Sequence, residues 1–489
     1  MRKKEKSMNK RVKWIIVGAA AAVILGGALV ALKLTAPDDT PEETEEAEVT
    51  SRLMYEKRPE DLKKLTIRNE TGEYEIVSDG SSGFTIEAIN AVPLNSNLLT
   101  STAEAACSVT IQDTVTENAE DMSVYGLAEP RAEVKAEFGD SANTVKEFLI
   151  GDVTPKSGRT YFAFKGENTV YTVKTTDVSR YLNKEYDYVQ KTVFSDETDE
   201  EGNKPLIEDM IVSRRDIPYL IELVYDERQE DETLTTGNTS SHLMTSPVTL
   251  SLNPDTANPV LNALYGLTAE EAVVIEPTEQ DLEAYGLTDD TCFGKLAMKL
   301  PEQIFKLTIG NEVTDDDGNV TGYYCYVNGF DVIYNFSSSS LPWATLMPLD
   351  ITSTMVTSNY IYDLSSIEIK TADKTYDLEM TGSSSDDFTV KIDGKDIETD
   401  RFKTFYQFLL RTSAEELYLQ ETDAEPYLTI TIKTTRGNTD VLEYIADSDR
   451  MTIIKLNGNA DFRCRTAYTD RLLENLDALI NGGEFATTW

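Results

Sequence analysis

The sequence predicts an α+β protein in which one N-terminal transmembrane helix precedes three related antiparallel sheet-plus-helix units in tandem. Three observations lead to this prediction. One stretch of nineteen residues lacks any charge, and the chain after it repeats its own strand and turn motifs. Its strands are separated by Gly- and Ser-rich turns and lack the βαβ rhythm of a parallel sheet.

The uncharged stretch spans residues 14–32 and reads WIIVGAAAAVILGGALVAL. At about 1.5 Å of rise per residue, such a helix matches the ~30 Å hydrocarbon core of a bilayer. Residues 1–13 contain seven basic side chains and one acid, whereas residues 33–55 are acidic. Because basic flanks stay in the cytoplasm, we predict a signal anchor in a bacterial plasma membrane. Residues 1–13 would then be a cytoplasmic tail and residues 33–55 an extended linker outside the membrane.

A cleaved signal peptide is one alternative for this stretch, and a soluble core helix is another. Signal peptides usually have an apolar region of about 7–15 residues that ends at a small-x-small site. Here the stretch is longer, and Ala28 and Ala31 are three positions apart. Gly18, Ala22 and Gly26 recur every four positions, which would let a second helix approach closely.

The charge of the chain is strongly asymmetric. Residues 1–33 hold eight of the 45 basic side chains but one of the 86 acidic ones, which leaves 37 basic against 85 acidic residues beyond them. Such a surface repels nucleic acid and anionic lipid headgroups, so we expect no nucleic-acid partner. Solubility explains this acidity, and binding of cations is the sharper alternative.

The first and last units open alike. DLKKLTI at 61–67 corresponds to DLSSIEI at 363–369, and each is followed by a second strand, a Ser-rich turn and a third strand. Helical stretches follow at roughly 95–111 and 398–411, the latter with aromatic residues at helical spacing.

The second halves of the first two units also match. YGLAEPRAEVKAEF (125–138) corresponds to YGLTDDTCFGKLAMKL (285–300), and each leads into a strand that ends in Ile-Gly. The hairpins YFAFKGENTVYTV (161–173) and YCYVNGFDVIYNF (324–336) align without a gap. The last unit lacks the YGL triplet but keeps predicted strands at 428–433, 440–445, 451–456 and 461–465, and a helix at 469–480.

These matches divide the outer part of the chain into three units. We assign unit 1 to residues 56–192, unit 2 to 205–350 and unit 3 to 358–483. The charged, turn-rich segment SDETDEEGNK (195–204) is the predicted linker between units 1 and 2, and unit 2 carries a polar insertion near 227–247.

The triplet YGL begins at Tyr125, Tyr265 and Tyr285. Its chemistry is that of a helix stop, because glycine accepts the left-handed conformation after the last turn and the following Leu packs back onto that turn. A glycine that contacts a ligand is the alternative. If the stop is real, Gly286→Val destabilises unit 2.

An acidic run at 314–319, TDDDGN, invites comparison with a calcium loop. In an EF-hand the glycine is the sixth residue, which would make Val313 the first ligand, and valine has no side-chain oxygen. The run is better explained as a hairpin turn in which Asp-Gly supplies positive φ.

Histidine and cysteine usage offers no metal or nucleophile site. The single histidine, His242, lies in the polar stretch GNTSSHLMTS and is predicted to be an exposed loop residue. The four cysteines are too dispersed for a disulfide scaffold or a zinc site, although a bridge between Cys292 and Cys325 within one unit stays open. The cysteines are Cys107, Cys292, Cys325 and Cys464.

Catalytic motifs are also missing from the sequence. There is no Gly-x-Ser-x-Gly, no phosphate-binding loop and no His-Glu-x-x-His. We therefore predict that the protein is not an enzyme, with no catalytic, cofactor-binding or metal-binding residues and no cofactor. A paired-carboxylate hydrolase stays an alternative, since the chain is rich in Asp and Glu.

The element YGLAEP (125–130), the Ile-Gly-Asp turn (150–152) and the Tyr-rich hairpin (161–173) together resemble the bacterial domain of unknown function 4340 (DUF4340). That family typically carries YGL…P, a strand, IG(D/N) and then YY…G…VY. The resemblance is close in unit 1, fair in unit 2, where Asp289-Asp290 replaces Glu-Pro, and weak in unit 3. It implies an N-terminal span, an extracytoplasmic body and, for some members, association with ABC-type transporter components. It implies no catalytic residues.

The leading functional hypothesis is an outward-facing, membrane-anchored interaction module that is accessory to an envelope ABC-type transport system. A protein that binds a cell-wall polymer or a cation is the second hypothesis, suggested by the acidic, Tyr-rich composition. The envelope hydrolase is the third. The membrane and possible transporter subunits are the predicted partners, and no small-molecule ligand follows from the sequence.

Overall fold

The computed structural model describes residues 51–81, 83–155, 158–230, 240–352, 355–357 and 359–488. The predicted transmembrane helix at 14–32 and the linker as far as residue 50 lie outside these residues. Among the residues that are described, no helix is both long and apolar enough to cross a bilayer.

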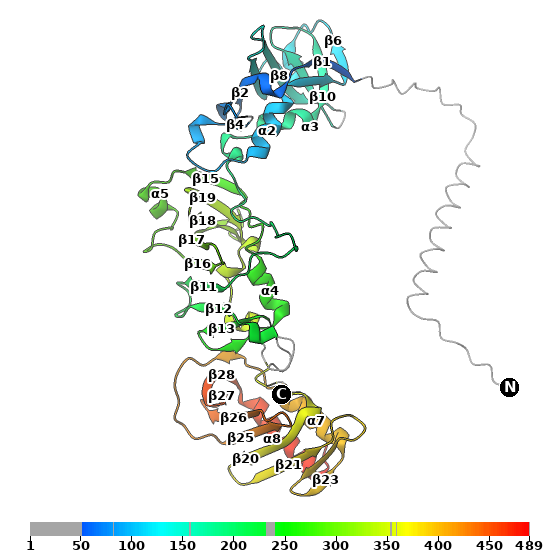
Figure 1. Cartoon of the computed structure of the whole chain (residues 1–489), viewed down its shortest axis with the longest axis vertical. Helices are drawn as coiled ribbons and strands as arrows, with labels where there is room; N and C mark the ends of the chain where they lie inside the picture. The colour runs from blue at the N-terminus through cyan, green and yellow to red at the C-terminus, as the bar shows by residue number, and fades with distance from the viewer. Residues whose placement is uncertain are drawn as a thin grey trace, which may run out of the picture.

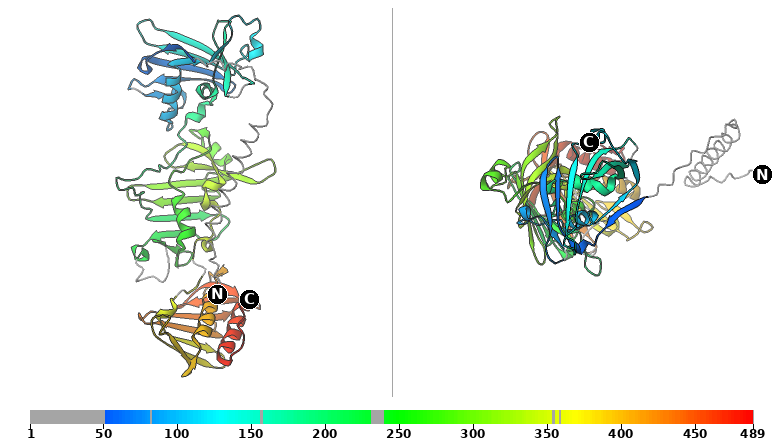
Figure 2. Two further views of the ribbon diagram at one scale, coloured as in Figure 1. Left: turned by 90° about the vertical axis from the view of Figure 1, so that its right-hand side faces the viewer. Right: turned by 90° about the horizontal axis from the view of Figure 1, so that it is seen from above.

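The fold is mostly β, with strands in four antiparallel sheets. Three of these sheets are large and follow one another along the long axis of the molecule (Figure 1). The view from the side shows the same order, with the first sheet in blue and cyan and the third in yellow to red (Figure 2).

The first large sheet has the strand order β4-β3-β2-β7-β8-β9-β10-β6, and a separate two-stranded sheet joins β1 to β5. Helix α2 (Ser96–Ala105) lies between β4 and β5 in the chain, and the short helix α3 (Thr175–Val178) follows β10. The strands are β1 (Arg52–Glu56), β2 (Leu62–Asn69), β3 (Gly72–Ser78), β4 (Phe84–Thr85), β5 (Ser108–Ile111), β6 (Asp113–Thr116), β7 (Ala132–Phe138), β8 (Val145–Val153), β9 (Arg159–Phe164) and β10 (Val170–Lys174).

The second large sheet has the order β14-β13-β12-β11-β16-β17-β18-β19-β15. Its helices are α4 (Pro254–Asn262), α5 (Glu279–Ala284) and α6 (Pro348–Ile351). The strands are β11 (Asp209–Arg214), β12 (Ile221–Tyr225), β13 (His242–Ser246), β14 (Leu250–Ser251), β15 (Glu271–Ile275), β16 (Gly294–Lys299), β17 (Ile304–Thr314), β18 (Val320–Val327) and β19 (Val332–Ser337).

The third large sheet has the order β23-β22-β21-β20-β25-β26-β27-β28-β24, with helices α7 (Thr399–Leu410) and α8 (Thr466–Asn481). The strands are β20 (Leu364–Thr371), β21 (Thr375–Thr381), β22 (Thr389–Ile392), β23 (Lys395–Ile397), β24 (Glu416–Leu417), β25 (Leu428–Thr434), β26 (Thr439–Ala446), β27 (Met451–Leu456) and β28 (Asn459–Arg465). Short 3-10 helices used below are η3 (Met122–Tyr125), η4 (Ser179–Leu182) and η8 (Pro342–Ala344).

The three large sheets share one strand order, except that the opening meander has three strands in the first sheet and four in the other two. In each, an opening meander and a closing four-stranded meander meet at the centre, where β2 pairs with β7, β11 with β16 and β20 with β25. A strand from the connection between the meanders crosses to the far edge, as β6, β15 and β24. A helix, α2, α4 or α7, precedes that edge strand.

Each sheet buries one face and exposes the other, as alternating strands require. In β7 the buried side chains alternate with half-buried Glu and Lys side chains. The first and second sheets share one continuous apolar core, in which Phe194 packs edge-on against Phe305 with ring centroids 5.8 Å apart. The third sheet has a core of its own, which includes Phe402 and Phe405 of α7.

The exposed face of the first sheet carries rows of opposite charges. Lys64 Nζ lies 2.9 Å from Glu75 on the neighbouring strand, and Lys165 Nζ, just after β9, lies 3.1 Å from Glu133 of β7, across β8. Lys135 pairs with Glu137 at 2.8 Å. Exposed pairs of this kind contribute at most about 1 kcal/mol each, so they make the face hydrophilic more than they stabilise the sheet.

Most predicted elements of the last unit are confirmed to within two or three residues, because strand alternation and helical spacing were clear there. α7, α8, β25, β26, β27 and β28 coincide with the stretches expected. The helical stretch predicted at 95–111 ends earlier, at Ala105, and its last residues belong to β5. The strand β1 begins at Arg52, inside the segment that the sequence assigns to the linker.

Candidate functional site

Two YGL triplets form the helix stops that the sequence predicts. Gly126 ends η3 with φ +67°, and its N–H bonds the Ser123 carbonyl at 3.1 Å. Gly286 follows α5 with φ +69°, and Leu287 N–H reaches back to the Leu282 carbonyl at 2.7 Å. The leucine after each glycine is buried, as expected for a left-handed helix end.

The same triplets pack against the Ile-Gly pairs, which lie within β8 and β17 where the strand register shifts, and not in turns. A Cβ on Gly151 would overlap the Tyr125 carbonyl oxygen, and a Cβ on Gly310 would overlap that of Tyr285. The tyrosine rings then meet the closing hairpins edge-on, Tyr125 with Tyr161 at 5.1 Å. In the second sheet Tyr285 meets Tyr324 in the same way, at 4.7 Å. The motifs that carried the family resemblance therefore form one structural joint in each of these two sheets.

The third triplet has a different role. Gly266 has φ +76° in the turn after α4, and the Leu267 carbonyl accepts a bond from Val193 N–H at 2.8 Å. Tyr265 packs on Phe194 with centroids 6.0 Å apart. This triplet joins the first sheet to the second, which the sequence did not foresee.

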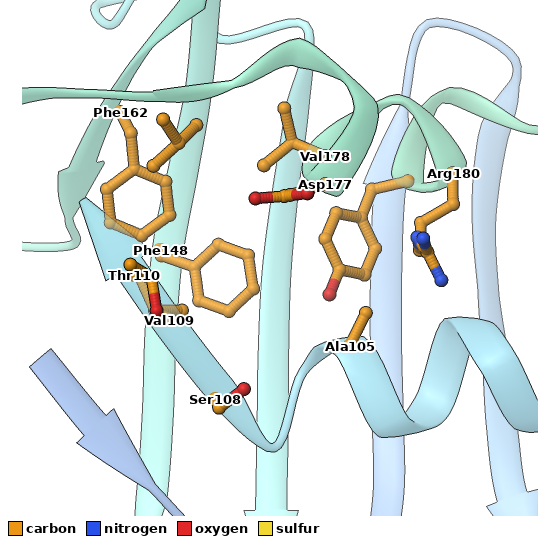
Figure 3. A pocket seen from close by; sticks show the side chains of 11 residues that line it. Ala105, Ser108, Val109, Thr110, Phe148, Phe162, Asp177, Val178 and Arg180 are labelled. Atoms are coloured by element: carbon orange, nitrogen blue, oxygen red, sulfur yellow. The ribbon is translucent and has the colours of Figure 1, made fainter. Parts of the chain in front are cut away.

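The first sheet also contains a cavity of about 280 Å³ (Figure 3). Part of its wall is apolar and includes Phe148 of β8, Phe162 of β9 and Val109 of β5. Asp177 and Arg180, from α3 and η4, lie at its exposed side. The remaining lining residues are Ala105, Ser108, Thr110, Val173, Val178 and Tyr181.

The cavity exists because the strand at this edge of the sheet divides in two. β6 pairs with β10 only from Val170 to Thr172, and Gln112 N–H bonds the Thr172 carbonyl. The residues just before β6, Ser108–Ile111, form β5, which lies outside this sheet and pairs with β1. A wedge therefore opens between β5 and the end of β10, and α3, with four residues, is too short to fill it.

Tyr181 supplies the buried polar group of this cavity. Its side chain is 2% exposed, and its ring meets that of Phe148 edge-on at 5.6 Å. No described residue hydrogen-bonds its hydroxyl. Burial raises the pKa of this phenol well above its usual value, so the hydroxyl stays protonated and can donate.

The structure corrects the prediction for His242. The side chain is buried at the start of β13, not exposed in a loop. Its Nε2 lies 2.7 Å from the Ile207 carbonyl, which can only accept, so Nε2 carries the proton. Burial lowers the pKa of the ring, and the hydrogen bond to Ile207 opposes this shift only in part.

The acidic run at 314–319 and the four cysteines have structural roles. Asp315 closes the predicted hairpin turn, accepting from the N–H groups of Asp317 and Asn319 at 3.0 and 2.8 Å, while Gly318 has φ +83°. The Asn319 side-chain amide, which donates to Asp315 Oδ2 at 3.0 Å, and these backbone bonds together lower the pKa of the Asp315 carboxyl. All four cysteines are buried and free, so Cys292 and Cys325 form no bridge in this structure. In the described part of the chain, no cluster of three His, Cys, Asp or Glu side chains could hold a metal ion.

Comparisons with known proteins identify one family. No curated protein and no solved structure matches the chain. The family described as Domain of unknown function (DUF4340) matches residues 85–289. That range begins in β4, contains the whole cavity and ends just after the Gly286 stop, so it includes parts of both the first and the second sheet. The chain therefore carries a match to the DUF4340 domain family over these residues.

Proposed function

We propose that this protein is a single-pass, outward-facing interaction module of a bacterial envelope, without catalytic activity of its own and accessory to an ABC-type transport system. The observation that carries the proposal is the order of the N-terminal segments. A basic tail, an uncharged stretch of bilayer length and an acidic linker stand directly before β1. The DUF4340 match supports it, because the family resemblance implies the same layout.

The body is in this proposal a threefold repeat of one sheet-plus-helix unit. The shared strand order of the three large sheets supports this, as do the matching joints around Tyr125 and Tyr285. Stacking such units gives an extended body with a long hydrophilic surface, which suits contact with a partner at a distance from the membrane.

Protease protection tests the orientation. Protease added to intact cells whose plasma membrane is exposed should degrade the body and leave a fragment that contains the anchor. A cytoplasmic protein of the same cells serves as the control and must survive until lysis. Survival of the body until lysis would refute the outward orientation.

Affinity purification tests the partner. The full chain, extracted in mild detergent after crosslinking in intact cells, should recover the membrane or nucleotide-binding subunits of a transporter. A matched chain in which an unrelated single-pass anchor replaces residues 1–32 separates contacts made by the body from those made by the span. Recovery of no transporter subunit with either chain would contradict the proposal.

The acidic composition favours one second candidate, a binding protein for a cell-wall polymer. The 85 acidic side chains beyond residue 33 exceed the 37 basic ones, which suits a cationic or cation-bridged polymer. Sedimentation with isolated cell wall, with and without chelator, measures it. Retention that chelator abolishes would favour this candidate over the transporter module.

A further inference from the structure

We propose that the cavity of the first sheet binds a small zwitterion with a bulky apolar side chain, an α-amino acid of the leucine or phenylalanine class. Three features lead to this ligand: the apolar side chains in the wall, the Tyr181 hydroxyl beside the Arg180 guanidinium, and the carboxylate at the open side. The inference is independent of the anchor and of any transporter.

The walls define the apolar part of the ligand. Phe148, Phe162 and Val173 belong to three adjacent strands and form one side, and Val109 of β5 forms the other. Specific small-molecule sites usually measure about 300–1,000 Å³. At about 280 Å³, this cavity lies just below that range and suits a compact molecule better than a lipid or an oligosaccharide.

Tyr181 and Arg180 bring a hydroxyl donor and a positive charge to the cavity. The Tyr181 hydroxyl has no hydrogen-bond partner among the described residues, whereas the Arg180 Nε is buried away from the open space. Arg180 Nη1 donates to the Ser101 carbonyl at 2.5 Å, which fixes the guanidinium at this place. A ligand carboxylate placed here would accept a hydrogen bond from the Tyr181 hydroxyl and lie beside the positive charge of Arg180.

One acceptor complements these donors. Asp177 is exposed at the open side of the cavity, and its carboxylate forms no ion pair with the basic side chains of the described residues. Figure 3 shows Asp177 above the apolar wall near Phe148, with Arg180 on the other side of the view. A simple carboxylate ligand would be repelled by Asp177 and a simple amine by Arg180. A zwitterion satisfies both.

In the other two large sheets, a large side chain fills the space that follows the last strand of the closing meander. After β19, Trp343 of η8 is fully buried and its indole N–H bonds the Val260 carbonyl at 3.1 Å. After β28, Tyr468 of α8 bonds the Leu409 carbonyl at 3.1 Å and stacks on Phe408. In both, a large side chain fills the space and its polar atom is bonded. In the first sheet, Tyr181 lines an open cavity instead.

Calorimetric titration of the full chain in detergent tests the proposal with L-phenylalanine and L-leucine as probes. 3-Phenylpropionate lacks the ammonium group and 2-phenylethylamine lacks the carboxylate, so they measure each charge separately. We expect both amino acids to bind, and each analogue to bind at least about tenfold more weakly because one charge-assisted contact is lost.

Variants locate the site. Tyr181→Phe removes one donor without changing the cavity walls and should weaken binding about fivefold to tenfold. Arg180→Gln and Asp177→Asn should weaken binding of the amino acids by tenfold or more, while Asp177→Asn should improve binding of 3-phenylpropionate. Tyr334→Phe removes a buried hydroxyl in the second sheet, where it bonds the Gln190 carbonyl at 2.7 Å, and should leave binding unchanged.

Ala105→Trp fills the cavity from α2 and should abolish binding, with circular dichroism confirming that the chain is folded. The proposal is overturned if neither amino acid binds to the folded wild-type chain. It is also overturned if binding survives Tyr181→Phe and Ala105→Trp unchanged, or if an analogue lacking one charge binds as tightly as the amino acids. None of these results bears on membrane orientation, so they leave the proposed function to its own tests.

Discussion

Replacing Gly286 by alanine tests the joint between the YGL triplet and the Ile-Gly pair of β17 in the second sheet. Its φ of +69° is one that an L-residue adopts at a cost of about 1–2 kcal/mol. The added Cβ would also overlap Asn311 Oδ1 and lie 2.9 Å from Asn311 Cγ. Moving Asn311 breaks its bond to the Ala284 carbonyl, 3.0 Å long, for about another 1 kcal/mol. The expected destabilisation is about 2–3 kcal/mol.

Gly329→Ala is the matched control. Gly329 has φ +90°, but a Cβ there meets nothing within 4 Å, so the variant carries the backbone strain without the overlap. Gly266→Ala is a second control, since its Cβ would make an ordinary contact with Asp196 at 3.5 Å. Both should lose about 1–2 kcal/mol.

Tryptophan fluorescence can follow the part of the shared core that contains the second sheet. The chain has three tryptophans, at 14, 343 and 489, and Trp343 is buried in the shared core near α4. In a Trp14→Phe, Trp489→Phe background, urea unfolding followed by fluorescence therefore reports the region around Trp343. A Gly286→Ala midpoint that equals the Gly329→Ala midpoint, at equal slopes, would refute the proposed packing of the joint.

Three further predictions concern buried groups. The Arg214 side chain is 1% exposed and donates to the Leu346 carbonyl at 2.8 Å, so Arg214→Met should destabilise the protein by about 3–5 kcal/mol. Its ion-pair partner Asp216 is half-exposed, so Asp216→Asn should cost under about 1 kcal/mol. Urea unfolding measures both variants. Because burial lowers the pKa of His242 in the folded state, the free energy of unfolding should fall as the pH drops below the unfolded-state pKa of about 6.5. His242→Gln should therefore make the free energy of unfolding depend less on pH between pH 5 and 7, and an unchanged slope would contradict this. The buried thiols should resist alkylation by iodoacetamide at pH 8 until the chain unfolds, because burial raises the pKa of Cys107 to about 11 and that of Cys464 to about 12. All four cysteines are free in this structure, so a Cys292–Cys325 disulfide found by mass spectrometry would contradict it.

Features set by neighbouring residues were predictable from the sequence. The helix stop at Gly286, the hairpin turn closed by Asp315 and the aromatic face of α7 all depend on residues within a few positions of one another. The matching hairpins at 161–173 and 324–336 were visible as well, because paired strands need alternation and a turn glycine in the same chain segment.

Features set by distant segments were not predictable. His242 lies in a polar stretch, and its burial depends on the Ile207 carbonyl, 35 residues earlier. The cavity depends on β5 leaving the sheet to pair with β1, and the sequence 108–111 alternates as any edge strand does. No sequence motif marked Tyr181 or Arg180 as candidate binding residues.

The small sheet of β1 and β5 determines where a force on the N-terminal segment would act on the fold. β1 is the first described strand after the linker, and it holds β5 through four paired positions. Lys57 follows it, tied to the Cys107 carbonyl at 2.7 Å and to Asp140 at 2.6 Å. If residues 14–32 anchor the chain as we propose, tension on the N-terminal segment would enter the fold at the strand that supports one wall of the cavity. A pull strong enough to peel β1 away would loosen β5 before it disturbed any of the large sheets.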